Sequence, residues 1–192
     1  MPLEYQTPPT SGHLRQGEIL RDVFENRADC AATQPEINPV SVQPRVHPLT
    51  IVMSAQCDLL WDWEERSQPN AERIAEESLP RLIPHVLLCD LFTEDEIRSS
   101  HGMNSTLWTG VKKNQNERYH HLPAARIGDS GQLGDLYIDF KKVYGIPTGN
   151  LYKALNSSSV RRVARVAVVP GPYVHDIIHR FYAFQSRVAV PD

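Results

Sequence analysis

Two short apolar runs, residues 49–54 and 86–92, limit most strongly what this chain can fold into. Each run is rich in Val, Ile and Leu, and each has the length of a strand that is buried on both faces. We expect the two runs to pair in the middle of a sheet. Residues 17–24 and 160–169 are two further β-rich stretches, and alternating apolar and polar residues over 136–141 predict a half-buried strand.

Three other segments carry helical patterns. Thr93 and Glu96 form a capping pair, which predicts a short helix over residues 93–102. Residues 69–79 predict a surface helix inserted between the two central strands. Near the C-terminus, two prolines and a glycine precede apolar residues that recur at helical spacing: Val174, Ile177, Ile178 and Phe181. The fold class is therefore mixed β with peripheral helices, one of them an amphipathic helix near the C-terminus.

The length of 192 residues fits a single domain with its own core. Three prolines among the first eleven residues predict a disordered or draped tail over residues 1–15, followed by one domain over 16–192. Four prolines within residues 25–48 predict a long loop there.

Composition narrows the functional classes. Hydrophobic residues make up 41% and charged residues 22%, as in ordinary soluble proteins, and no apolar run reaches the ~20 residues of a membrane span, so we expect a cytoplasmic protein. The net charge of -3 means that any contact with nucleic acid needs a local basic patch. The cysteines and histidines show no zinc-site spacing, so neither a metal nor another cofactor is predicted.

The order of these segments and three local motifs resemble the MazF/PemK family of toxin endoribonucleases. Residues 16–20 are similar to the family's opening strand, which combines a glycine, an acidic residue and aliphatic residues. His47 and Pro48, followed by the apolar run at 49–54, are similar to the family's Arg-Pro and apolar strand. The run at 86–92 leads into Thr93, in the place of the strand that ends in the family's catalytic Thr or Ser.

This chain departs from the family in two respects. His47 stands where the family has arginine, with Arg45 two residues earlier, and the chain carries insertions near residues 61–81 and 107–134. The resemblance implies a small SH3-like β-barrel with a C-terminal helix. It also implies a toxin or defence-system protein that acts on single-stranded RNA as a metal-independent endoribonuclease, often as a homodimer and paired with an antitoxin. The alternative is a catalytically inactive module that binds a protein partner in a phage-defence or stress-response pathway.

The candidate catalytic residues are Arg45, His47 and Thr93. RNA cleavage without a metal needs a base, an acid and a cation near the phosphate. His47 would move protons near neutral pH, Arg45 would hold the phosphate, and Thr93 would donate a hydrogen bond. The plain alternative is that His47 is a loop residue before a proline.

Aromatic and nucleophilic residues give further candidates. Trp61 and Trp63 share one face of an extended segment and would stack on RNA bases or cover the core, and Arg21 is a third RNA-binding candidate. Cys57 and Asp58 follow a buried strand, and His120 and His121 are adjacent histidines. These four residues would form a Cys/His site or else play structural roles. Because adjacent residues of a strand point to opposite faces, shared metal ligation by His120 and His121 is disfavoured.

Overall fold

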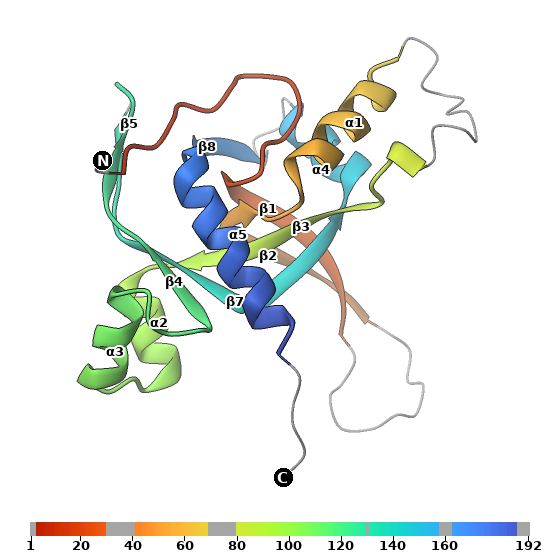
Figure 1. Ribbon diagram of the computed structural model, residues 1–192. Helices are drawn as coiled ribbons and strands as arrows, with labels where there is room; N and C mark the ends of the chain where they lie inside the picture. Colours follow the sequence, from red (N-terminus) through yellow and green to blue (C-terminus); the bar gives the residue numbers. More distant parts are fainter. Residues whose placement is uncertain (1–2, 30–40, 69–79, 130, 158–162, 188–192) are drawn as a thin grey trace.

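A computed structural model describes residues 3–29, 41–68, 80–129, 131–157 and 163–187. Six strands of this part form one antiparallel sheet in the order β4-β7-β3-β2-β1-β8 (Figure 1). A separate small hairpin pairs β5 (Ala125–Ile127) with β6 (Gly131–Leu133). The strands of the main sheet are β1 (Glu18–Asp29), β2 (Ser41–Val52), β3 (His85–Phe92), β4 (Tyr119–Leu122), β7 (Leu136–Pro147) and β8 (Ala164–Val168).

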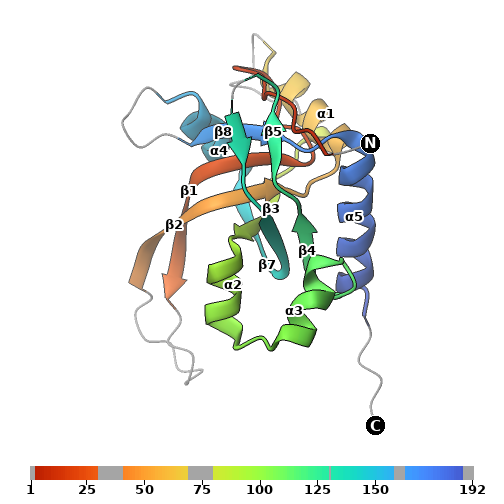
Figure 2. The same cartoon turned by 90° about the vertical axis from the view of Figure 1, so that its left-hand side faces the viewer.

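Five helices in the described ranges surround this sheet: α1 (Gln56–Arg66), α2 (Glu94–His101), α3 (Ser105–Lys112), α4 (Thr148–Leu155) and α5 (Gly171–Gln185). Helix α5 crosses one face of the sheet (Figure 1) and packs on the first core, which includes Ile19, Ile51 and Phe140. Helices α1 and α4 pack on a second core around Leu20, Leu88 and Leu151. Helices α2 and α3 lie next to β4 and β7 (Figure 2) and cover a third core around Trp108 and Tyr137.

The central strands and two of the predicted helices are confirmed. Ile51 pairs with Ile19 on one side and with Cys89 on the other, so β2 lies between β1 and β3. In α5, Val174, Ile177 and Phe181 are buried, as their helical spacing predicts. Helix α2 follows a complete capping box between Thr93 and Glu96 and ends at Gly102, whose φ of 54° is left-handed. The helix predicted over residues 69–79 lies outside the described residues, and β8 accounts for part of the stretch 160–169.

The loop predicted over residues 25–48 is wrong at both of its ends. Strand β1 continues to Asp29, β2 begins at Ser41, and the two pair as far as Asp29 and Ser41. The prolines do not prevent this pairing, because β3 borders β2 only at residues 50–52. At Pro44 and Pro48, β2 therefore lacks a second neighbouring strand, and a missing backbone N–H is tolerated there.

Two other expectations need correction. The alternation of residues 136–141 is confirmed, but Tyr137 and Asp139 on the second face are also buried, because α2 and α3 cover Tyr137 and Arg118 binds Asp139. Residues 107–134, expected only as an insertion, contain most of α3 together with β4, β5 and β6. Asn104 caps α3 through a hydrogen bond to the backbone N–H of Leu107, a local signal that the sequence reading missed.

The main sheet does not close into a barrel within the described residues. Strands β4 and β8 end the sheet on opposite sides and do not pair with each other. Instead, Gln6 bridges to Val168 of β8, and Tyr5 bridges to Ile127 of β5. Residues 3–15 are thus draped along the fold, with the side chain of Tyr5 buried in the first core. Among the described residues, no helix has the length and apolar character required to cross a membrane.

Candidate functional site

The candidate site lies on the β1–β2 hairpin, beyond a kink at Asp22. Asp22 has a left-handed φ of 58°, which Asp adopts more readily than most residues. Leu20 and Val23, three residues apart, both pack in the second core, whereas regular alternation would place them on opposite faces. The kink therefore turns the outer part of the hairpin, which carries Val23 opposite His47, toward the second-core side of the sheet.

His47 is held between two carboxyl groups. Its Nδ1 lies 2.6 Å from Oδ1 of Asp90 on β3, and its Nε2 lies 3.1 Å from Oε2 of Glu25 on β1. The ring of Tyr144 on β7 stacks on the imidazole, with 3.9 Å between ring centroids. The His47 side chain is only 2% exposed, so these three contacts fix its orientation. A neutral imidazole has a single N–H and can donate to only one of the two carboxyl groups. Both contacts can be hydrogen bonds at the same time only when the three groups hold one additional proton.

A cation completes this group of residues. Nη2 of Arg45 lies 3.6 Å from Oδ2 of Asp90, and the Arg45 side chain is 42% exposed. Burial, followed by the negative charge of Asp90, raises the pKa of the Tyr144 hydroxyl far above its usual value, so Tyr144 stays neutral. Glu25, Arg45, His47, Asp90 and Tyr144 are called the His47 cluster below. It combines a buried imidazole, held between two carboxyl groups, with a cation that reaches solvent.

The structure brings together two of the three predicted catalytic residues. Arg45 and His47 both contact Asp90. Thr93 instead caps α2: its Oγ1 donates to Oε2 of Glu96 and accepts a hydrogen bond from the backbone N–H of Glu96. The catalytic role of Thr93 stays a prediction.

The RNA-binding candidates lie on two elements, α1 and β1. Trp61 and Trp63 are on α1, where residues two apart point about 200° away from each other, so the prediction of a shared face is wrong. Trp63 packs on Tyr152, with 5.0 Å between ring centroids, and Trp61 is exposed. Arg21 is exposed on β1, next to the kink.

The Cys/His candidates do not meet. Cys57 and Asp58 occupy the first turn of α1, where Sγ of Cys57 lies 3.4 Å from Oδ1 of Asp58. In the part of the chain described, no hydrogen bond joins Cys57 to His120 or His121 on β4. His121 contacts Asp135, whereas His120 is buried, and burial lowers its pKa to about 3.

Sequence reasoning missed Glu25, Asp90 and Tyr144. Asp90 carried a signal, because a carboxylate inside an otherwise apolar strand must find a partner when it is buried. Glu25 and Tyr144 carried no such signal in the sequence, because only the pairing of β1 with β2 and of β3 with β7 places them beside His47.

Comparison with known proteins adds no assignment. No family model matches this chain, and no match was found among curated proteins.

Proposed function

We propose that the chain is a MazF/PemK-like toxin or defence-system protein that cleaves single-stranded RNA without a metal, using the His47 cluster. The observation that carries the proposal is the placement of His47 between Asp90 and Glu25, with Arg45 bound to the same Asp90. A fixed imidazole between carboxylates, next to a cation, supplies the acid, the base and the phosphate-binding group that this reaction needs.

In this proposal four residues of the cluster take part in the reaction. Asp90 orients the ring through Nδ1, and Arg45 binds the scissile phosphate. Glu25 is the more exposed carboxylate, with 23% exposure against 8% for Asp90, and it takes the proton from the ribose 2′-hydroxyl. The 2′-oxygen attacks phosphorus, the bond to the 5′-oxygen breaks, and Nε2 of His47 protonates that leaving oxygen. The products are a 2′,3′-cyclic phosphate and a 5′-hydroxyl.

The contact between Glu25 and His47 also resets the site. After cleavage, Glu25 holds a proton and Nε2 of His47 has lost one. Since the two atoms lie 3.1 Å apart, the proton passes directly from Glu25 to His47. The starting protonation state returns without another acid or base.

The finer fold assignment is part of this proposal. We infer that the sheet is a divergent form of the SH3-like barrel. The order of the strands, the C-terminal helix and the bridges that residues 5 and 6 make between β8 and β5 support this inference. The proposal places the protein in the cytoplasm, as a homodimer with an antitoxin or another defence component as its partner. Light scattering after gel filtration measures the oligomeric state.

The test is cleavage of a long single-stranded RNA in the presence of EDTA. We expect the wild type to cleave and His47→Gln to be slower by roughly 10²–10⁴-fold, the usual contribution of a general acid or base. His120→Gln is the matched control, because His120 is an equally buried histidine that does not contact the cluster. Thermal melts establish that each variant is folded. Intact RNA with the wild type, or equal cleavage by a folded His47→Gln, would contradict the proposal.

One observation favours the second candidate, an inactive module that binds a protein partner. The His47 ring is almost fully buried, and Glu25 covers its Nε2. In this alternative the cluster only fastens the β1–β2 hairpin to β3. Absence of both cleavage and RNA binding by the wild type would support it.

A further inference from the structure

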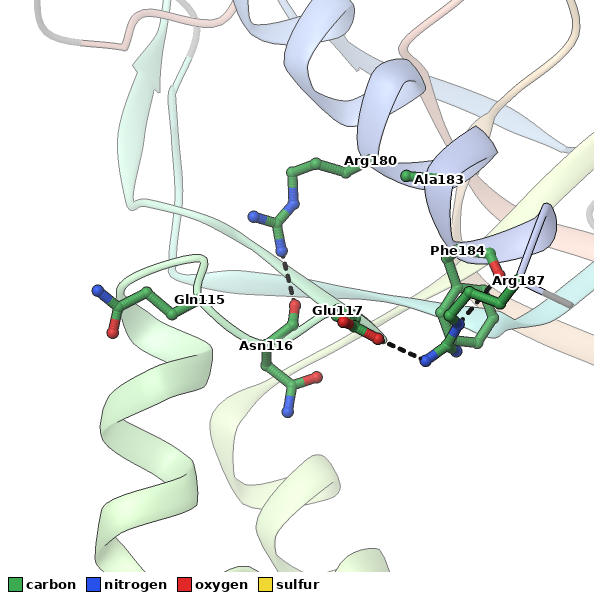
Figure 3. A pocket seen from close by; sticks show the side chains of 7 residues that line it. All are labelled: Gln115, Asn116, Glu117, Arg180, Ala183, Phe184 and Arg187. Carbon is green, nitrogen blue, oxygen red and sulfur yellow. Dashed lines mark hydrogen bonds and ion pairs between the residues drawn. The ribbon is translucent and has the colours of Figure 1, made fainter. Parts of the chain in front are cut away.

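A pocket of about 220 Å³ lies between the end of α5 and the turn that precedes β4 (Figure 3). Ala183 and Phe184 form an apolar wall, Arg180 extends from the same helix α5, and Arg187 follows the end of that helix. The volume is below the ~300–1,000 Å³ typical of sites for whole small molecules, so the pocket suits one ring system. It lies apart from the His47 cluster and contains none of that cluster's residues.

Flat groups and charges of both signs surround this pocket. The guanidinium of Arg187 lies over the ring of Phe184, 4.0 Å from its centroid, and Nη1 of Arg187 is 2.7 Å from Oε2 of Glu117. Figure 3 shows Arg180 reaching across to the backbone carbonyl of Asn116, while Glu117 closes the pocket toward Arg187. Aromatic rings and guanidinium planes stack on unpaired bases, and carboxylates and guanidinium groups bind base edges.

Arg180 is held in place by the protein itself. It donates hydrogen bonds to the backbone carbonyls of Asn114, Asn116 and Tyr119. Burial lowers the pKa of its guanidinium, and the nearby charge of Asp176 offsets this only in part. A fixed, partly buried cation of this kind favours a ligand with hydrogen-bond acceptors beside the apolar wall.

Strand β7 connects this pocket to the His47 cluster. Phe184 packs near Phe140, with 6.2 Å between ring centroids, and His47 stacks on Tyr144. Four residues of strand span at most about 13 Å, and the path between the two sites passes around the edge of β7 from the first-core side of the sheet to the second-core side.

The strand bulges between these two positions. Ile138 pairs with Leu91 and Val143 pairs with Cys89, so β7 carries extra residues between the two pairs. Lys141 and Lys142 lie in this bulge, and their side chains are exposed. Within the described ranges, neither lysine forms an ion pair with a carboxylate. Both charges are therefore available to phosphates.

We propose that this pocket binds one unpaired base of the RNA, and that Lys141 and Lys142 bind the phosphates between the pocket and the His47 cluster. The inference rests on the proposed function, since it names how the same substrate is held. It adds a base-binding site that stacks the base against Phe184 and Arg187.

The test measures binding of a fluorescein-labelled 2′-O-methyl RNA of about 12 nucleotides, a length within the ~4–16 nucleotides of single-strand sites. The 2′-O-methyl group removes the nucleophile, so binding is read without cleavage. Phe184→Leu keeps apolar bulk and loses the ring, and we expect it to weaken binding about 5- to 150-fold. Tyr182→Leu is the matched control, because Tyr182 is an exposed aromatic residue of the same helix outside the pocket.

The lysines are tested through salt dependence. Replacing both Lys141 and Lys142 by alanine should reduce the slope of log affinity against log salt by about 1.4, since each phosphate contact on a single strand contributes ~0.7. Lys153→Ala, an exposed lysine on α4, should leave the slope unchanged.

The outcomes separate this inference from the proposed function. If the wild type cleaves RNA and folded Phe184→Leu binds as tightly as Tyr182→Leu, the base pocket is refuted while the proposed function stands. If the wild type neither binds nor cleaves RNA, both proposals fail together, and a protein segment replaces RNA as the ligand to test for this pocket.

Discussion

Replacing Phe181 by alanine removes the ring that fastens α5 to the sheet. Phe181 is 6% exposed, and its ring meets that of Phe140 edge-on, with 5.7 Å between centroids. The substitution loses the transfer free energy of the ring and leaves a cavity, because the surrounding residues relax only in part. Such changes cost about 3–5 kcal/mol of unfolding free energy. The Phe140 pairing contributes to this cost.

Denaturant and thermal unfolding measure this loss. For a chain of this length, 1 kcal/mol shifts the melting temperature by about 2–4 °C, so the expected drop is about 6–20 °C. Tyr182→Ala is the matched control: the next residue of α5 is 57% exposed, and its truncation should change stability by no more than about 0.5 kcal/mol. A loss below about 1 kcal/mol for Phe181→Ala would mean that the apolar face of α5 is not anchored as described.

Two further predictions concern a close approach and a buried titratable group. Gly17→Ala should destabilise the fold by about 1–3 kcal/mol, because Gly17 has a φ of +80° and a Cβ there would lie 2.4 Å from Cγ2 of Val174. Gly171→Ala, which meets no atom within 4 Å, is its control, and equal melting temperatures for the two variants would refute the reasoning. For His120, burial lowers the pKa from 6.5 to about 3, so the unfolded chain binds more protons between these values. The contribution of neutral His120 to stability is therefore complete above pH 6.5 and is lost as the pH falls toward 3, by on the order of 1 kcal/mol per pH unit. The charges of Arg180 and His121 lower the pKa of His120 further, and His120→Gln should flatten the measured pH dependence of unfolding.

Local patterns were enough to predict the parts of the fold that depend on apolar periodicity or on helix capping. The central strands and α5 follow from apolar periodicity, and α2 follows from the pair Thr93 and Glu96. The prolines of β2 led to the wrong prediction of a loop. A proline destabilises a strand only where a neighbouring strand would accept a hydrogen bond from the missing backbone N–H. That depends on where β3 stops, which the local sequence does not show.

The candidate site was predictable only in part for a related reason. Arg45 and His47 are close in sequence, so their shared location follows from chemistry and spacing. Glu25 and Asp90 reach them through strand register and the kink at Asp22, which reverses the alternation of the hairpin. For Trp61 and Trp63, the error is one of period, because the prediction of a shared face requires an extended segment and this segment is the helix α1.

The chemistry of the cut ends tests the central claim most directly. Mass spectrometry of the fragments from an RNA treated with the wild type in EDTA identifies the group at each new end. Attack by the 2′-hydroxyl through the His47 cluster predicts a 2′,3′-cyclic phosphate on one fragment and a 5′-hydroxyl on the other. These ends should be absent when the same RNA is treated with folded His47→Gln. Fragments that begin with a 5′-phosphate, or RNA that stays intact with the wild type, would contradict the account.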